Sequence, residues 1–181
     1  MKKFYNILTL LCVLFAATSC SNVIMEDQAE MPSHEKTTLV RIGDTAPDFT
    51  VQTLSGEKLT LSSMQGKTVL LVFFATSCPD CEAQLDLLNS VITLFDTDKF
   101  EILAISRGEK ITTVSKFISK KDYNFTIGVD RDKSIYSLYA TQYIPRCFVI
   151  DPLGHIEAIS VEYDKEEFEK VVEVIRLLLT L

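Results

Sequence analysis

The chain has 181 residues, 47% hydrophobic and 24% charged, which is enough for one globular domain with a buried core. Its net charge of −7 gives an acidic surface that repels phosphate backbones and argues against a nucleic-acid partner. Five cysteines are too few for a disulfide scaffold, and six glycines with five prolines are too few for a low-complexity chain.

The first twenty residues have the pattern of an export signal. A basic start precedes an apolar run over residues 7–17 that is too short to span a membrane. The run leads into Ala17-Thr18-Ser19-Cys20, which resembles the bacterial lipoprotein signal. In that signal small residues precede a cysteine, the chain is cleaved directly before this cysteine, and the cysteine carries the lipid. We therefore expect a signal peptide over residues 1–19 and a lipid on Cys20, with a plain secretory signal as the alternative.

The stretch after the signal is polar and acidic and shows no sustained hydrophobic period. We expect residues 20–40 to carry the lipid and act as a tether, and residues 41–181 to form the folded domain. Ser21 rather than Asp after the lipid site favours the outer membrane of a bacterial cell envelope. The domain would then face the periplasm, where disulfides can form.

The predicted elements alternate between strand and helix along the domain. Residues 48–53 and 58–61 flank Ser55-Gly56, which indicates a β-hairpin. The apolar run 68–74 (TVLLVFF) is typical of a buried central strand. The later patterns predict a helix over 79–95, a strand over 100–105, a helix over 110–121, a strand over 125–129, a short helix over 134–139, strands over 147–150 and 155–161, and a final amphipathic helix over 168–179. This order implies an α/β fold with a parallel core sheet, helices on both faces and terminal hairpins that make the sheet mixed.

Cys78-Pro79-Asp80-Cys81 lies between the most apolar strand and a clear helix. Cys78 then falls at the helix N-terminus, where free N–H groups and the helix dipole stabilise a thiolate. Pro79 suits the first helical turn, and Cys81 lies one turn on and close enough to close a disulfide. In an exported chain this arrangement indicates a redox-active pair.

A structural disulfide and half of a metal site are the alternatives for the two cysteines. So small a ring would constrain the unfolded chain little. A zinc site needs about four ligands, and only Cys147, His34 and His155 are available to complete one.

Three separated segments carry a family resemblance: Gly43–Phe49 (GDTAPDF), Val72–Cys81 (VFFATSCPDC) and Ile144–Asp151 (IPRCFVID) followed by Gly154. In this order they resemble the motifs of membrane-anchored thioredoxin-fold proteins of the TlpA/ResA type, which are related to AhpC/TSA. The resemblance implies a thioredoxin-like fold with an N-terminal β-hairpin and a thiol-disulfide oxidoreductase that needs no bound cofactor beyond its own disulfide. It also implies that Pro145 is cis and faces the cysteines, which would leave the Ile144 backbone free to pair with a substrate strand. A turn before a strand is the other reading of Pro145.

The chain departs from the family pattern around the cysteines. Ser77 replaces an aromatic residue, so the neighbouring surface is smaller and more polar. Gln84 stands where Glu is common and Val72 where thioredoxin keeps a buried Asp. Without those carboxylates, either a water shuttles the proton of Cys81 or release of its thiol is slow.

Asp80 places a negative charge near the Cys78 thiolate. Repulsion between the two destabilises the reduced form, which predicts a reductant rather than an oxidant. A favourable contact of Asp80 with the helix dipole is the alternative reading.

Arg146 and Cys147 follow Pro145, and Cys147 stands where Thr would be expected. Three readings of Arg146 stay open: it is solvated, it attracts an acidic substrate, or it favours the Cys78 thiolate and so opposes Asp80. We interpret Cys147 as a small buried strand residue, with a third redox thiol as the alternative.

The leading hypothesis is a lipid-anchored disulfide reductase in which Cys78 attacks a substrate disulfide and Cys81 resolves the mixed disulfide. Its expected partners are disulfide-bearing proteins, a membrane thiol reductase that returns electrons, and the membrane itself through Cys20; we expect a monomer. Cytochrome c maturation, rescue of misoxidised lipoproteins and reduction of sulfenic acids all fit such a dithiol.

Two other functions remain open from the sequence. A peroxiredoxin-type peroxidase shares the opening motif, but Phe74 and Ala75 occupy the places of its activating Pro and Thr. A non-catalytic or copper-handling thioredoxin-like module is the third, because two thiolates can hold copper(I).

Overall fold

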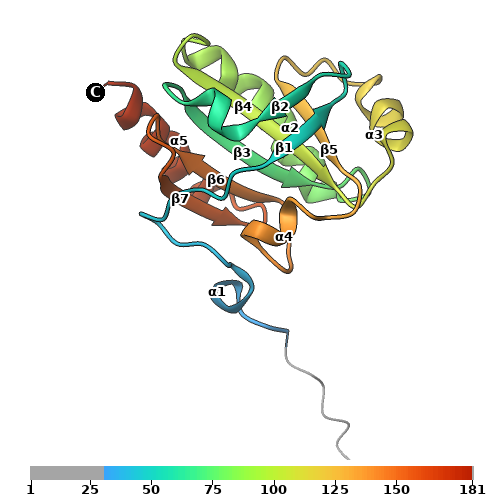
Figure 1. Ribbon diagram of the computed structural model, residues 1–181, viewed down its shortest axis with the longest axis horizontal. Coiled ribbons are helices and arrows are strands. Elements are labelled where there is room, and N and C mark those ends of the chain that lie inside the picture. Colours follow the sequence, from blue (N-terminus) through green and yellow to red (C-terminus); the bar gives the residue numbers. More distant parts are fainter. Residues whose placement is uncertain (1–30, 181) are drawn as a thin grey trace, which may run out of the picture. The chain divides into compact units, whose positions relative to one another are not determined.

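The apolar run at residues 68–74 is strand β3 (Thr68–Phe74), and all seven of its residues are buried. The computed structural model describes residues 31–180, of which those from Pro32 onward form one unit. β3 lies near the middle of a seven-stranded sheet in the order β2-β1-β5-β4-β3-β6-β7 (Figure 1). The expected central strand is therefore confirmed.

The sheet is mixed, as the chain order predicts. β3, β4 (Phe100–Arg107) and β5 (Thr126–Asp130) run parallel to one another. The remaining strands add antiparallel pairs at both sides: β6 (Arg146–Ile150) with β7 (Ile156–Val161), and β1 (Thr50–Thr53) with β2 (Lys58–Thr60). The N-terminal β-hairpin and the thioredoxin-like α/β arrangement are thus present.

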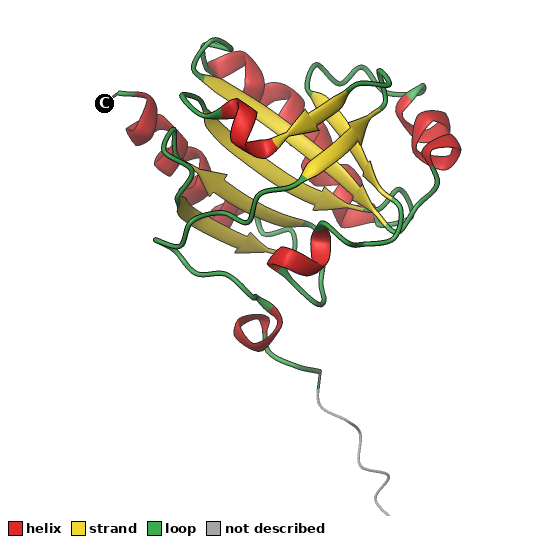
Figure 2. Ribbon diagram, in the orientation of Figure 1, coloured by secondary structure: helices red, strands yellow, loops and turns green. Residues whose placement is uncertain are grey.

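The two faces of the sheet carry separate hydrophobic clusters because side chains alternate along a strand. Leu70, Val72 and Phe74 face the cluster that contains residues of α2 (Pro79–Val91), α3 (Ile111–Ile118) and α5 (Lys165–Leu179). Val69, Leu71 and Phe73 face the cluster that contains residues of the 3₁₀ turn η1 (Leu61–Met64) and of α4 (Tyr136–Tyr139). Helical segments therefore cover both faces (Figure 2).

Several element boundaries differ from the sequence expectation. α2 ends at Val91 and passes into a 3₁₀ turn, η2 (Ile92–Leu94), although the apolar spacing continues to Phe95. β4 runs on to Arg107, two residues beyond its apolar pattern, because its backbone still pairs with β5 at Asp130. Backbone pairing does not require apolar side chains, so the pattern underestimates this strand.

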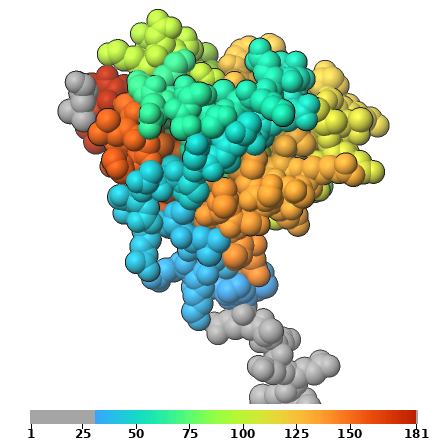
Figure 3. Space-filling model, viewed as in Figure 1, coloured from blue at the N-terminus to red at the C-terminus, as the bar shows by residue number. Residues whose placement is uncertain are grey.

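The domain begins earlier in the chain than the sequence analysis predicts. The expected tether reached residue 40, yet residues 34–37 form a short helix, α1 (His34–Thr37), and Thr38 bridges to Ala140. Thr37 and Val40 are buried, and Figure 3 shows this blue segment lying against the segment that carries α4. The folded unit therefore begins at Pro32 rather than residue 41. The expected signal peptide and Cys20 lie outside the described residues.

Between residues 31 and 180, none of the helices is both long and apolar enough to cross a bilayer.

Leu71→Ala should lower the free energy of unfolding by about 2–5 kcal/mol, because it leaves a cavity in the buried middle of β3. Leu71 is 0% exposed, whereas Leu153, in the turn before β7, is 72% exposed. Leu153→Ala is the matched control and should change the free energy by less than about 0.5 kcal/mol in urea unfolding. Equal losses for the two variants would contradict this placement of the core.

Candidate active site

The chain leaves the buried end of β3 and enters α2 at Cys78, which is the N-cap residue of the helix. The sulfur of Cys78 accepts the backbone N–H of Cys81 at 3.2 Å, and Pro79 occupies the first turn. Both expectations for this segment are confirmed. The Cys81 N–H and the positive end of the helix dipole therefore face the Cys78 sulfur, which is the environment that stabilises a thiolate.

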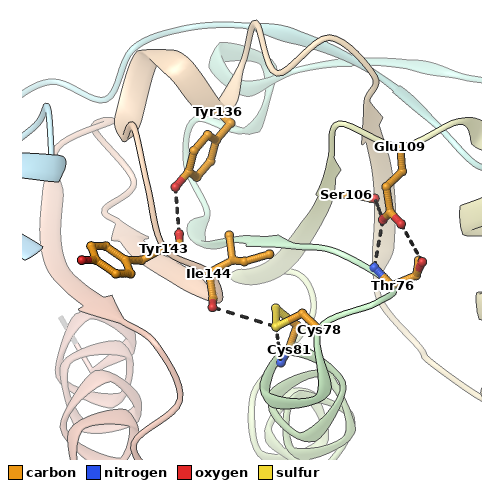
Figure 4. Close-up of a disulfide and its surroundings, with 8 residues drawn as sticks. All are labelled: Thr76, Cys78, Cys81, Ser106, Glu109, Tyr136, Tyr143 and Ile144. Carbon is orange, nitrogen blue, oxygen red and sulfur yellow. Dashed lines mark hydrogen bonds between the residues drawn. A yellow bond between two sulfur atoms is a disulfide. The ribbon is translucent and has the colours of Figure 1, made fainter. Parts of the chain in front are cut away.

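Cys78 and Cys81 are joined in a disulfide with a Cα–Cα distance of 5.2 Å (Figure 4). The two sulfurs are not equivalent, because Cys81 is 0% exposed while Cys78 is only partly buried. Ser77, Pro79 and Asp80 are exposed beside Cys78. A molecule that approaches from solvent therefore meets Cys78 first.

A second segment, residues 142–145, completes the site from the other side. The Ile144–Pro145 peptide bond is cis, as the resemblance implies, and Pro145 is buried. The carbonyl oxygen of Ile144 points toward the disulfide and lies 3.9 Å from the Cys78 sulfur (Figure 4). The structure thus brings the Cys78–Cys81 pair together with Ile144 and Pro145, which lie more than sixty residues further along the chain.

Tyr136 in α4 holds this second segment and was not singled out from the sequence. Its hydroxyl lies 2.6 Å from the carbonyl oxygen of Gln142 and 2.8 Å from that of Tyr143, and its one proton is shared between them. Figure 4 draws the bond to Tyr143. Burial raises the pKa of this phenol, so it stays protonated and able to donate. Neither hydrophobic periodicity nor a motif marks Tyr136 in the sequence. Its role depends on hydrogen bonds to carbonyls six and seven residues further along an irregular segment.

Glu109, which follows β4, is a second residue that sequence reasoning missed. Its carboxylate accepts the backbone N–H of Thr76 at 2.9 Å and the hydroxyl of Thr76 at 2.6 Å, and also the hydroxyl of Ser106 (Figure 4). These bonds tie the loop before Cys78 to the end of β4. The only available sequence signal was an acidic residue after a strand that neighbours β3.

The structure corrects one of the three interpretations of Arg146, namely that its side chain is solvated. It is 0% exposed, and burial lowers the pKa of its guanidinium. Arg146 alternates with Cys147 along β6, so the two side chains lie on opposite faces of the sheet. Cys147 belongs to the cluster that contains Cys81, and the guanidinium of Arg146 binds oxygens of residues 37, 38 and 142 instead.

Cys147 is a buried free thiol, in agreement with its interpretation as a small strand residue. Its sulfur accepts a hydrogen bond from the side-chain amide of Gln84 at 3.1 Å. Burial raises the pKa of this thiol to about 12. Gln84 and Val72 are also buried, and neither side chain is ionisable, so the two positions where the family resemblance implies a carboxylate hold none.

A thioredoxin-like sheet that delivers a Cys-Pro-Asp-Cys disulfide to a helix N-terminus, opposite a cis-proline, defines the class of thiol-disulfide oxidoreductases. Comparisons with known proteins agree. The AhpC/TSA family profile matches residues 42–159. The thiol-disulfide oxidoreductase ResA of Geobacillus kaustophilus is 34% identical over 140 residues, which cover 77% of this chain and 80% of that protein.

Two solved structures are similar as well. One is a candidate protein disulfide isomerase from Bacteroides thetaiotaomicron, 33% identical with a TM-score of 0.75, covering 80% of this chain and 94% of the other. The other is a secreted disulfide oxidoreductase of Mycobacterium tuberculosis, 26% identical with a TM-score of 0.60, covering 69% and 94%. The chain therefore belongs to the AhpC/TSA family, and within it to the thiol-disulfide oxidoreductases of the ResA type.

Cys147 should resist alkylation in the folded protein even after the disulfide is reduced. Its raised pKa leaves almost no thiolate at pH 8, and burial blocks the reagent. Reduced protein treated with iodoacetamide at about pH 8 should carry label on Cys78, and Cys147 should be labelled only after unfolding in urea. Peptide mass spectrometry reads the sites, and rapid native labelling of Cys147 would contradict the buried placement.

Proposed function

We propose that the protein is a membrane-anchored, extracytoplasmic disulfide reductant that works through a mixed disulfide. The observation that carries this proposal is the asymmetry of the pair: Cys78 is reachable and caps α2, whereas Cys81 is fully buried behind it. Cys78 is then the nucleophile and Cys81 the resolving thiol.

In the first step the Cys78 thiolate attacks one sulfur of a substrate disulfide. A bond forms between Cys78 and that sulfur, the substrate disulfide breaks, and the other substrate sulfur leaves as a thiolate. The helix N-terminus that stabilises the Cys78 thiolate before attack supports this role.

In the second step Cys81 loses its proton and attacks the Cys78 sulfur, which releases the second substrate thiolate and forms the Cys78–Cys81 disulfide. The substrate gains two electrons, and the protein loses two. Val72 and Gln84 cannot accept the proton, so a water molecule is the proposed acceptor. A membrane thiol reductase would return the electrons to the Cys78–Cys81 disulfide, so the proposed cycle requires no bound cofactor.

Ile144 and Pro145 form the other wall of the proposed substrate groove. The Ile144 carbonyl faces the Cys78 sulfur and can accept a backbone N–H from an extended substrate segment. Exposed Ser77 leaves room for such a segment next to the disulfide. The substrates we propose are therefore proteins that carry a disulfide in an extended or flexible segment.

Asp80 supports the reducing direction. It is exposed in the first turn of α2, two residues from Cys78. Its charge opposes the Cys78 thiolate, which disfavours the reduced form and lowers the reduction potential. The guanidinium of Arg146 bonds on the other face of the sheet, so it is a weak counterweight to Asp80.

The proposal is tested first by trapping the intermediate. Cys81→Ser should accumulate a mixed disulfide between Cys78 and a protein substrate, while Cys78→Ser should accumulate none, because only the exposed thiol can attack. Non-reducing gels and mass spectrometry after exposure to oxidised insulin give the readout. Trapping by Cys78→Ser instead of Cys81→Ser would reverse the roles. Rapid consumption of hydrogen peroxide by Cys81→Ser would favour the peroxiredoxin alternative.

Asp80→Asn should raise the reduction potential of the Cys78–Cys81 couple by about 30 mV, since a tenfold change in equilibrium corresponds to about 30 mV for two electrons. The wild-type couple is expected at or below about −220 mV in a glutathione or dithiothreitol titration with thiols mapped by mass spectrometry.

Glu82→Gln is the matched control for this titration. It removes a charge from the same helical turn, but Glu82 already pairs with Lys121 at 2.7 Å. Its effect on the potential should be clearly smaller than that of Asp80→Asn. A wild-type potential near about −120 mV would mark an oxidant and overturn the proposed direction.

A further inference from the structure

Residues 32–38, which we name the N-terminal clasp, contain α1 and lie against the chain that leads to Pro145. The N–H of Thr141 donates to the carbonyl of Thr37 in the clasp, and directly after the clasp the N–H of Leu39 donates to the carbonyl of Tyr139, both at 2.9 Å. The clasp precedes the first family motif and lies outside residues 42–159, which match the family profile.

Arg146 makes the strongest connection to the clasp. Its Nη1 donates to the hydroxyl of Thr38 at 2.6 Å and its Nη2 donates to the hydroxyl of Thr37 at 2.7 Å. Its Nε donates to the carbonyl of Gln142 at 2.8 Å. One buried guanidinium thus bonds the clasp and the start of the substrate segment at the same time. Losing these acceptors would leave a buried charge without partners.

The two threonines suit this position because a hydroxyl can accept and donate together. Each accepts from Arg146 and donates to the carbonyl of His34, at 2.9 Å for Thr37 and 2.6 Å for Thr38. The hydroxyls therefore hold α1 on one side and the guanidinium on the other. Serine could do the same, whereas valine, of similar shape, could not.

A second connection runs through Tyr143. Its hydroxyl donates to the carbonyl of Pro32 at 2.6 Å, and the His34 ring packs edge-on against the Tyr143 ring with centroids 4.9 Å apart. His34 also lies 2.8 Å from a carboxylate oxygen of Glu162, whose backbone N–H donates to the carbonyl of Pro145. The clasp therefore contacts the chain on both sides of Ile144.

We propose that the N-terminal clasp is part of the active site and that Arg146 is a positioning residue. Together they hold residues 142–145 so that the Ile144 carbonyl faces the Cys78 sulfur and can receive a substrate backbone. The inference rests on the proposed pairing of substrate with Ile144, and it goes beyond it by assigning a role to a segment before the thioredoxin motifs.

The test uses the full chain with Thr37→Val and Thr38→Val combined. This variant should raise KM for reduction of insulin about tenfold and leave kcat within about twofold, because it loosens the substrate segment without touching the cysteines. Reduction of the small aryl disulfide DTNB, which needs no backbone pairing, should change by less than about twofold.

Two matched variants separate positioning from general damage. Thr37→Ser with Thr38→Ser keeps both hydroxyls and should restore the wild-type KM for insulin. Thr112→Val with Thr113→Val changes another adjacent threonine pair, exposed in α3, and should leave both substrates unaffected. If the double valine variant does not fold, Thr38→Val alone removes one acceptor of Arg146 and takes its place.

An unchanged KM for insulin, or parallel losses with insulin and DTNB, would overturn the inference. Amide hydrogen exchange over residues 141–147 gives a readout that does not depend on activity. The valine variant should exchange at least about tenfold faster there than the serine variant. A wild-type protein that reduces neither insulin nor DTNB contradicts the proposed function. Amide hydrogen exchange then tests the inference alone: faster exchange in the valine variant than in the serine variant supports the positioning role of the clasp, and equal exchange overturns it.

Discussion

The site depends on how β3 ends. Seven consecutive buried residues fix this strand in the middle of the sheet, and the chain must leave its end at the surface and turn into α2. Cys78 lies at that turn, and its sulfur takes the place of the oxygen that usually caps a helix. The same bond that starts the helix therefore places the reactive sulfur at the positive end of the helix dipole. Structure and reactivity share one interaction here.

The opposite wall of the site is built differently. Residues 142–145 are irregular, and no ladder of backbone bonds holds them. Side chains supply the missing constraints: the Tyr136 hydroxyl binds the carbonyls of Gln142 and Tyr143, and the Arg146 guanidinium binds the same Gln142 carbonyl. Buried hydrogen bonds of this kind are costly to leave unmade, so they hold the loop in one arrangement. The Ile144 carbonyl is thereby presented to the Cys78 sulfur.

The groups around the disulfide differ between the interior and the rim of the site. Gln84 bonds the Cys147 thiol, so the interior near Cys81 holds two neutral groups. Outside, Asp80 and Ser77 make the rim of the site acidic and small. A neutral interior and an acidic rim both disfavour a buried or partly buried thiolate, which supports the proposed reducing direction.

The sequence by itself determined the order of the strands and helices along the chain, the mixed sheet and the cysteine pair at a helix N-terminus, and the family resemblance implied the cis-proline opposite that pair. These follow from local rules or from motifs: a long apolar run, a CxxC before a helical period, and three segments in a known order. Only the tertiary structure decided that Arg146 is buried, that Tyr136 and Glu109 support the site, and that residues 32–40 belong to the domain. The reason is physical: each of these depends on polar partners distant along the chain or in irregular segments, and a polar residue that will be buried by such partners looks in sequence the same as one that stays in water.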